Sequence, residues 1–412
     1  MPQRSLVRVG GVLLAASLAL TACGSREAGT TPGTNSTGGN TATKVAKIGV
    51  IAPLSGDLAS LGLGIQHSVE LAVKQANDSG AIPGWKLEVV AKDDEAKPDV
   101  GKNAATALAG DKSVVGVVGT LNSSVAQSVI PVLATAKIVQ VSPANTNPSL
   151  TQGAAFATAP ARPNANYFRT CTTDSVQGPF AARYLFEKAG AKKVATIHDK
   201  KTYGQGLVDA FTAEFKKLGG EIVAAETINP DDANYSAVIS KVKTAGPAAV
   251  YYGGEFPQAG PLSKQMKAAG LNVPLMGGDG IFAADFIKLA GDSGAGDLST
   301  AVGAPLEKMA KGAEFKAAYE KMAFKEPYEA YGAYAYDAAQ SIIEALKVSL
   351  KSATAVDDAA KQATIDALGK VSFDGVTGKV SFDQYGDTTS RVLTVYTVEG
   401  GKWAAKDTAA FE

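Results

Sequence analysis

The chain has 412 residues, of which 45% are hydrophobic, and its 40 basic and 40 acidic side chains leave no formal net charge. This length allows two or three globular domains with large cores. Because a balanced charge provides no general attraction for nucleic acid or for an anionic membrane surface, we expect neither as a direct partner.

The first residues follow the pattern of an export signal. Arg4 and Arg8 precede an apolar run, residues 9–20, that is too short and too rich in small residues to span a membrane comfortably. The run ends in LTAC, which resembles a bacterial lipobox. We therefore expect residues 1–22 to be a lipoprotein signal peptide and Cys23 to be lipidated at the cell membrane. The alternative is an ordinary secretory signal in which Cys23 is incidental.

Residues 23–44 are predicted to be the lipidated cysteine and a flexible tether, because their Gly, Ser, Thr, Asn and Pro residues show no apolar periodicity. The only other cysteine is Cys171. An internal disulfide is therefore impossible in the mature chain, and Cys171 is expected to be a buried, unreactive thiol.

From residue 45 onward, short apolar runs alternate with helical patterns. Runs that are apolar on both faces, separated by helices, indicate a parallel sheet covered on both sides. The expected strands are 46–55, 85–93, 114–119 and 138–144, and the expected helices are 65–77, 100–110 and 123–136.

The same pattern restarts after residue 178 and predicts a second doubly wound lobe. Its expected strands are 192–199, 221–228, 248–254 and 274–280, and its expected helices are 180–190, 207–220, 235–245 and 263–270. A long amphipathic helix is expected over 328–348, with hairpin and strand material in 371–383 and 391–404. These last segments come too late to fit simply onto the second sheet, so the α/β chain is expected to cross between two Rossmann-like lobes more than once.

Catalytic, metal and cofactor sites are not expected. GDSGAG, residues 291–296, invites a serine-protease interpretation, but the chain has only His67 and His198, and neither has an evident serine and acid around it. The segment is better interpreted as a turn after a helix. The acidic residues 93–95 precede a helix start, where they offset its dipole, and no phosphate-loop motif occurs.

Seven segments together resemble the branched-chain amino-acid binding proteins of ABC importers, the Leu/Ile/Val-binding family of type I periplasmic binding proteins. They are IAPLSGDLASLG (51–62), VVGTLNSSVAQSVIP (117–131), VSPANTNPSLT (141–151), DSVQGPFAARYL (174–185), IHDKKTYGQGL (197–207), VYYGG (250–254) and LMGGDG (275–280). The resemblance implies lobe 1 in 45–173 plus 303–386, and lobe 2 in 174–302 plus 387–412.

The resemblance also implies a site for the ligand carboxylate at Asn122 and Ser123, where a strand meets a helix, and at Ala144 and Thr146 in the next loop. A helix N-terminus with neutral donors suits a carboxylate that must leave again. The alternative is that Asn122 and Ser123 only cap the helix, and some capping is expected in either case.

In the second lobe, Asp279 matches the acid that meets the ligand ammonium, and we expect it to be ionised and exposed in its glycine-flanked turn. The alternative is a simple Asx turn. Tyr203 and Tyr331 match aromatic neighbours of the ligand, although tyrosines at helical spacing often belong to a core.

Two family aromatic positions carry other residues here, Leu61 in the first loop and Glu255 after YYGG. Together with Asp279, Glu255 makes the second-lobe wall more acidic, which could favour a ligand with an additional amine or amide.

The sequence thus predicts a monomeric, lipid-anchored extracytoplasmic receptor, not an enzyme, that binds an amino acid, branched-chain or otherwise apolar, and delivers it to an ABC permease. The alternatives are a receptor of the same fold for an amide, urea-like or aromatic acid ligand, and a sensory subunit that reports such a ligand to a signalling protein.

The first testable prediction concerns Cys23. Replacing Cys23 with Ser removes the only acylation site, and a neutral domain has no other means of staying at a bilayer. The Cys23→Ser protein should therefore move from the membrane to the soluble fraction of the expressing cells, whereas Cys171→Ser should not. A Cys23→Ser protein that still sediments with membranes after a salt wash would contradict lipidation.

Overall fold

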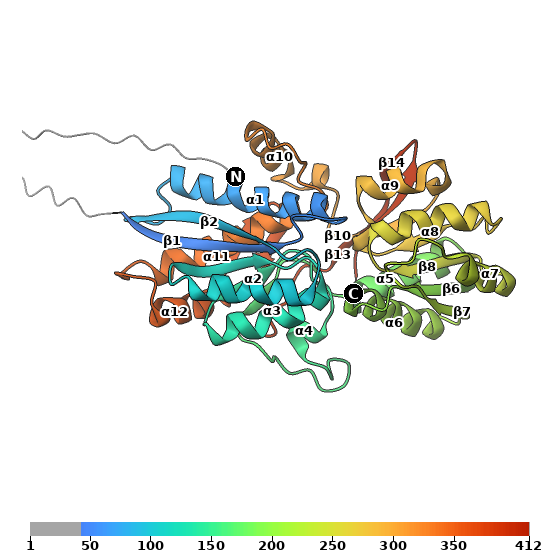
Figure 1. Cartoon of the computed structure of the whole chain (residues 1–412), viewed down its shortest axis with the longest axis horizontal. Coiled ribbons are helices and arrows are strands. Elements are labelled where there is room, and N and C mark those ends of the chain that lie inside the picture. Colours follow the sequence, from blue (N-terminus) through green and yellow to red (C-terminus); the bar gives the residue numbers. More distant parts are fainter. Residues whose placement is uncertain (1–42, 412) are drawn as a thin grey trace, which may run out of the picture. The chain divides into compact units, whose positions relative to one another are not determined.

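The computed structural model describes residues 43–411. The predicted signal peptide, Cys23 and nearly all of the predicted tether lie outside the described residues. The described chain builds two α/β layers around separate sheets (Figure 1).

The first sheet is five-stranded and parallel, in the order β2-β1-β3-β4-β5. Its strands are β1 (Lys44–Ala52), β2 (Trp85–Asp93), β3 (Val114–Gly119), β4 (Val139–Ser142) and β5 (Tyr167–Arg169). The helices between them are α1 (Ala59–Asp78), α2 (Pro98–Gly110), α3 (Ser123–Thr135) and the short α4 (Ser149–Gln152).

The continuous apolar run of β3 explains why helices cover both faces of this sheet. Val115 and Val118 belong to one apolar cluster, which also contains residues of α1, whereas Val114 and Val117 belong to another with residues of α2 and α3. Successive strand residues point to opposite faces, except that a register shift between the pairs Lys47–Val114 and Ile48–Gly116 brings Val114 and Val117 to the same face. An uninterrupted apolar run therefore requires a helix on each side.

The second sheet has seven strands in the order β14-β13-β10-β9-β8-β6-β7. Its parallel strands are β6 (Lys193–His198), β7 (Glu221–Thr227), β8 (Ala249–Gly253), β9 (Leu275–Gly277) and β10 (Leu298–Val302), and β13 (Val392–Glu399) and β14 (Lys402–Ala410) are added antiparallel. Its helices are α5 (Asp174–Arg183, continued as a π-helix over Tyr184–Lys188), α6 (Thr202–Lys217), α7 (Ser236–Ala245), α8 (Phe256–Ala268) and α9 (Ala284–Ala290).

The segments after β10 are divided between the two layers. Helix α11 (Gly332–Ser349) packs against α1, β3 and β4, so it belongs with the first sheet, as do α12 (Asp358–Leu368) and α10 (Gly312–Lys321). The strands β11 (Ser372–Gly375) and β12 (Gly378–Ser381) form their own two-stranded sheet. Residues 391–404 join the second sheet, because β13 pairs with β10 and β14 pairs with β13.

Several helices also begin earlier than the sequence predicts. Helix α1 begins at Ala59 instead of residue 65, and α5 begins at Asp174 instead of residue 180. Conversely, residues 328–331 precede α11 and do not belong to it. GDSGAG forms a short 3-10 segment, Gly291–Gly294, directly after α9, as the turn interpretation requires.

The chain passes between the sheets after β5, after β10 and after β12. Hydrogen bonds link these crossing segments to one another and to α11. The Tyr334 hydroxyl donates to the Val302 carbonyl at 2.7 Å, and the Thr170 hydroxyl donates to the Tyr334 carbonyl at 3.0 Å. The Gly303 amide donates to the Val392 carbonyl at 2.8 Å. Cys171 is fully buried beside Val302 and Tyr334, and burial raises the pKa of its thiol, which fits the predicted unreactive role.

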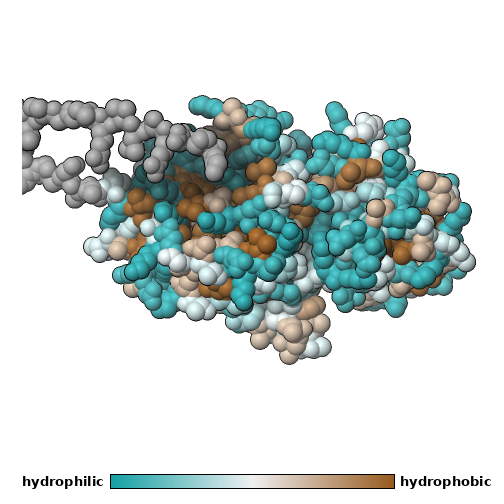
Figure 2. Space-filling view, viewed as in Figure 1, coloured by the Kyte–Doolittle hydropathy of each residue, from teal (hydrophilic) through white to brown (hydrophobic). Residues whose placement is uncertain are grey.

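Within residues 43–411, no helix combines the length and the apolar character needed to cross a membrane. Figure 2 shows hydrophilic residues over much of the visible face, with hydrophobic ones in separate groups. The apolar side chains are instead gathered in the cores on either side of the two sheets.

Candidate functional site

A buried carboxylate lies where elements of both sheets meet. Asp279 follows β9 and is only 2% exposed. It accepts hydrogen bonds from the Gln177 amide at 2.8 Å, from the Tyr203 hydroxyl at 2.8 Å and from the Tyr331 hydroxyl at 2.9 Å. Tyr331 directly precedes α11 on the first sheet, so its bond to Asp279 joins the two layers.

The expectation that Asp279 is exposed is therefore wrong. The glycines beside it allow Tyr203 and Leu207 to come so close that a Cβ on Gly278 would lie 2.4 Å from the Tyr203 hydroxyl. Burial raises the pKa of Asp279 and outweighs the three hydrogen bonds, which favour the charged form. A cation placed beside this carboxylate would lower its pKa again and offset the cost of burial.

Close backbone approach positions Tyr203. It lies in the first turn of α6, which begins against the end of β8, because Gly204 and Gly253 face each other without side chains. A Cβ on Gly204 would lie 2.4 Å from the Gly253 carbonyl oxygen. Only glycine permits this contact, which directs the Tyr203 hydroxyl at Asp279.

The N-terminus of α3 lies on the first-sheet side of the same region. Asn122 occupies the cap position and Ser123 the first helical position, and both are buried. No side chain caps this helix, so the expected capping contribution is wrong. The N–H groups of the first turn and the Ser123 hydroxyl are thus kept for another acceptor, which the helix dipole would favour as an anion.

Asn122 instead makes a second link between the layers. Its side-chain amide donates to Glu255 at 2.8 Å, and the other oxygen of Glu255 pairs with the Lys201 ammonium at 2.8 Å. Burial tends to lower the pKa of Lys201, but Glu255 outweighs it and the pKa is raised. Close by, burial and Glu255 raise the pKa of Asp199 to about 8. Lys201 therefore offsets the extra acidity that Glu255 brings to this wall.

Eight of the nine predicted ligand-binding residues line one small space between the sheets. They are Leu61, Asn122, Ser123, Ala144, Tyr203, Glu255, Asp279 and Tyr331, joined by Leu121 and Gly280. The sequence suggested that Leu61 lies in the loop before the first helix, but it lies in the first turn of α1.

Thr146 is the exception. It is fully buried but does not line this space, and its carbonyl accepts the amide of Asp174 at 2.8 Å. Nor is the Ala144 amide free, because it donates to the Ser142 hydroxyl at 3.2 Å. The loop after β4 therefore offers fewer direct donors than the resemblance implies.

A buried arginine fixes that loop. Arg169, fully buried, pairs with Asp387 at 2.6 Å and donates to the carbonyls of Asn145 and Asn147 at 2.7 and 3.0 Å. Since the buried charge is both paired and hydrogen-bonded, the cost of its burial is largely offset. The loop that carries Ala144 is thereby tied to the passage before β13.

A second buried acid, Asp174, begins α5 where the chain enters the second sheet. It is fully buried, and within residues 43–411 neither carboxyl oxygen has a hydrogen-bond donor. Burial, with a smaller effect from Asp279, raises the pKa of Asp174 to about 8.

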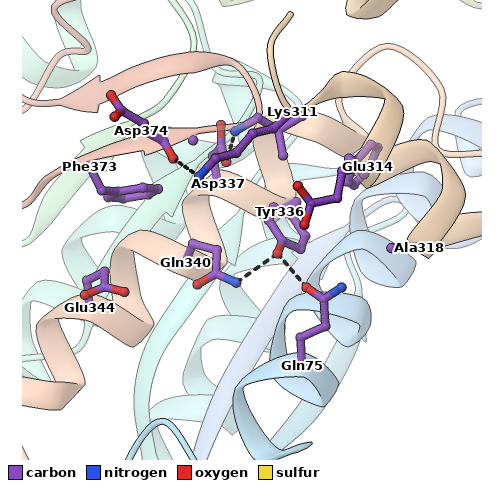
Figure 3. A pocket seen from close by; sticks show the side chains of 13 residues that line it. Gln75, Lys311, Glu314, Ala318, Tyr336, Asp337, Gln340, Glu344, Phe373 and Asp374 are labelled. Atoms are coloured by element: carbon purple, nitrogen blue, oxygen red, sulfur yellow. Dashed lines mark hydrogen bonds between the residues drawn. The ribbon is translucent and has the colours of Figure 1, made fainter. Parts of the chain in front are cut away.

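Another hollow lies away from this region, between α1, α10, α11 and β11 (Figure 3). Several of its polar side chains already have partners: the Lys311 ammonium donates to the Asp374 backbone carbonyl at 2.6 Å, and Tyr336 bridges Gln75 and Gln340. Across the described part of the chain, no cluster of His, Cys, Asp and Glu suits a metal ion.

Sequence reasoning missed Gln177 and Lys201. Gln177 both donates to Asp279 and accepts its backbone amide at 2.9 Å. It was hidden because the helix that carries it was expected to begin later. Lys201 comes two residues before Tyr203, and a lysine at that place normally suggests a solvated charge.

Comparison with known proteins assigns this architecture. The family profile described as periplasmic binding protein matches residues 45–402. The chain belongs to the periplasmic binding protein family. It is 36% identical over 355 residues to Leu/Ile/Val-binding protein homolog 1 of Brucella abortus, covering 86% of this chain and 90% of that protein.

Two solved structures have the same fold. The branched-chain amino acid transporter substrate binding protein LivJ from Streptococcus pneumoniae, in complex with isoleucine, is 29% identical with a TM-score of 0.78, covering 89% of this chain and 100% of the other. A solute binding protein of an ABC transporter from R. palustris, in complex with benzoate, is 24% identical with a TM-score of 0.76, covering 89% and 97%.

The second prediction tests the bond between the layers. Tyr331→Phe keeps the ring but removes the hydroxyl that joins Asp279 to the first sheet, a hydrogen bond to a charged group that contributes about 1.5–3 kcal/mol. Tyr203→Phe is the matched control, since it removes another hydroxyl from the same carboxylate within the second-sheet layer. Small-angle scattering of the protein with its copurified ligand should show a larger radius of gyration for Tyr331→Phe only. Equal profiles for both variants would contradict a joining role.

Proposed function

We propose that this protein is the extracytoplasmic receptor of an ABC importer, which captures an amino acid with a branched-chain or other apolar side chain. Supporting this is the convergence of an uncapped helix N-terminus and a buried carboxylate on one small space. An α-amino acid carries both complementary charges, a carboxylate for α3 and an ammonium for Asp279. Cys23 anchors the monomeric receptor to the membrane, and the partner that receives the ligand is the permease.

The two layers act as lobes that close on the ligand, residues 45–173 plus 303–386 and residues 174–302 plus 387–412. Ligand contacts on both lobes favour the closed arrangement, and only this difference in affinity can drive closure. No covalent step is involved. His67 stacks on Phe324 at 4.2 Å and His198 accepts the Lys200 amide at 3.1 Å, so neither histidine is engaged as a base beside a nucleophile.

The pairing of Glu255 with Lys201 argues for an uncharged ligand side chain. An unpaired Glu255 would attract a second amine, as the sequence suggested, but Lys201 and Asn122 already occupy both of its oxygens. The benzoate complex of a chain with this fold keeps an aromatic acid open as an alternative ligand. Benzoate has no ammonium, so thermal-shift screening of amino acids against amides and aromatic acids separates the two classes.

The third prediction tests the amino-acid assignment. With the copurified ligand identified by mass spectrometry, Asp279→Asn should weaken binding by about 1.5–3 kcal/mol, roughly ten- to a hundred-fold, because the bond to the ammonium is charged. Ser123→Ala removes one neutral donor and should cost about 1–2 kcal/mol. Titration calorimetry measures both, with Asp292→Asn, an exposed acid, as the control. If folded Asp279→Asn binds as tightly as the wild type, Asp279 does not bind an ammonium, and the amino-acid assignment is contradicted.

The fourth prediction concerns Lys201. Lys201→Met leaves the Glu255 carboxylate without its cation, so the variant should gain affinity for lysine relative to leucine by roughly ten-fold. Lys200→Met is the matched control, because the neighbouring Lys200 pairs with Asn229 on the surface. Competition between the two amino acids for each variant gives the ratio. If the ratio stays at the wild-type value, Glu255 does not face the ligand side chain.

A further inference from the structure

A larger hollow adjoins the candidate amino-acid site on the far side of Asp279 and Tyr331. Both residues line the two spaces, so their hydrogen bond is the partition between them. The hollow measures about 1550 Å³, including the solvent at its open side. We call it the partition pit and define it by Asp279, Phe282, Tyr328, Tyr331, Tyr334 and Trp403.

Aromatic rings form the walls of the partition pit, and neighbouring side chains hold them in place. On the second-sheet side, the Phe282 ring lies 4.3 Å from Tyr396 and 5.6 Å from Trp403, measured between centroids. The indole N–H of Trp403 donates to the Ala283 carbonyl at 3.0 Å. These rings are therefore fixed before any ligand arrives, which lowers the entropic cost of binding.

The opposite wall comes from the first-sheet layer. The Tyr328 ring packs edge-on against Phe315 and Tyr319, at centroid distances of 5.5 and 5.6 Å. Fixed aromatic walls on two sides suit a flat aromatic molecule, which can pack face-on or edge-on against them.

Charge and polarity in the pit favour an uncharged occupant. The exposed rim carries two lysines, Lys288 and Lys402, together with Glu307 and the half-buried Glu329, so it has no strong excess of either sign. Buried residues, among them Asp279, Ala283 and Tyr334, line the inner part of the pit. An apolar wall with a few polar groups at its end is the usual composition of a small-molecule site.

We propose that the partition pit is a second ligand site, for a small uncharged aromatic molecule such as a phenol, and that its occupant strengthens binding of the amino acid. Elements of both sheets line the pit, so an occupant stabilises their contact. It also touches the Asp279–Tyr331 pair, which the amino acid contacts from the other side. This coupling rests on the proposed function, whereas binding in the pit does not. By linkage, the amino acid strengthens binding in the pit by the same factor.

The pit contains its own reporter, since the chain has two tryptophans and only Trp403 lines it. We expect p-cresol, added to the purified full-length protein, to change tryptophan emission in a saturable way. The change should persist in Trp85→Phe and disappear in Trp403→Phe. A response that rises linearly with concentration, or one that persists in Trp403→Phe, overturns the proposal.

Filling the pit provides the matched pair of variants. Ala304→Phe places a ring in the half-buried wall and should weaken p-cresol binding by roughly ten-fold or more, whereas Ala154→Phe, on an exposed loop, should not. Equal p-cresol affinity in both variants contradicts the assignment. A protein dimer that persists with p-cresol and dissociates in Ala304→Phe also contradicts it, because the pit would then be the contact with a second copy of the chain.

Calorimetry with the copurified amino acid then separates the two sites. Saturating p-cresol should lower the dissociation constant of the amino acid about five-fold or more. Competition between the two would place p-cresol in the amino-acid site and overturn the second site. If the pit binds p-cresol normally but Asp279→Asn leaves the amino-acid affinity unchanged, the proposed function fails and the pit remains.

Discussion

The buried carboxylate of Asp279 is the constraint around which the rest of the molecule is arranged. A carboxylate with so little access to water must find donors within the protein, and here they come from the start of α5, the start of α6 and the residue before α11. The approach of these donors explains the glycines on either side of Asp279, since larger residues would keep the donors away.

Polar contacts join the two layers, beside an apolar cluster that contains residues of both. Besides Tyr331, Asn122 reaches Glu255, Gln127 accepts from Thr202 at 3.1 Å, and Ser60 donates to Asp285 at 3.0 Å. Water can replace each of these bonds when the layers separate, so the net free energy of each is small. Such polar contacts are suited to a reversible closure, because they can break and re-form as the layers separate and meet.

The strand and helix pattern of the sequence predicts both sheets because β3 and its neighbours are apolar on both faces. It misplaces the starts of α1 and α5, since their first turns carry Gly, Ser and Gln and are held by tertiary contacts instead of by their own periodicity. Of the nine positions that the resemblance names, eight line one space between the sheets, and Thr146 lies elsewhere. Burial of Asp279 and pairing of Lys201 depend on residues distant in the chain, and no local pattern encodes them.

Asp174 gives the fold a dependence on proton concentration. Its carboxyl group, buried without a donor at the entrance to the second layer, has a pKa of about 8, raised from the ordinary 3.8 of an aspartic acid. Between these two values the folded chain retains a proton that the unfolded chain has released. Folding therefore takes up a proton in this range, and the contribution of Asp174 to the free energy of unfolding falls as the pH rises from about 4 to about 8. Asp174 therefore makes the folded receptor more stable in mildly acidic surroundings than in alkaline ones.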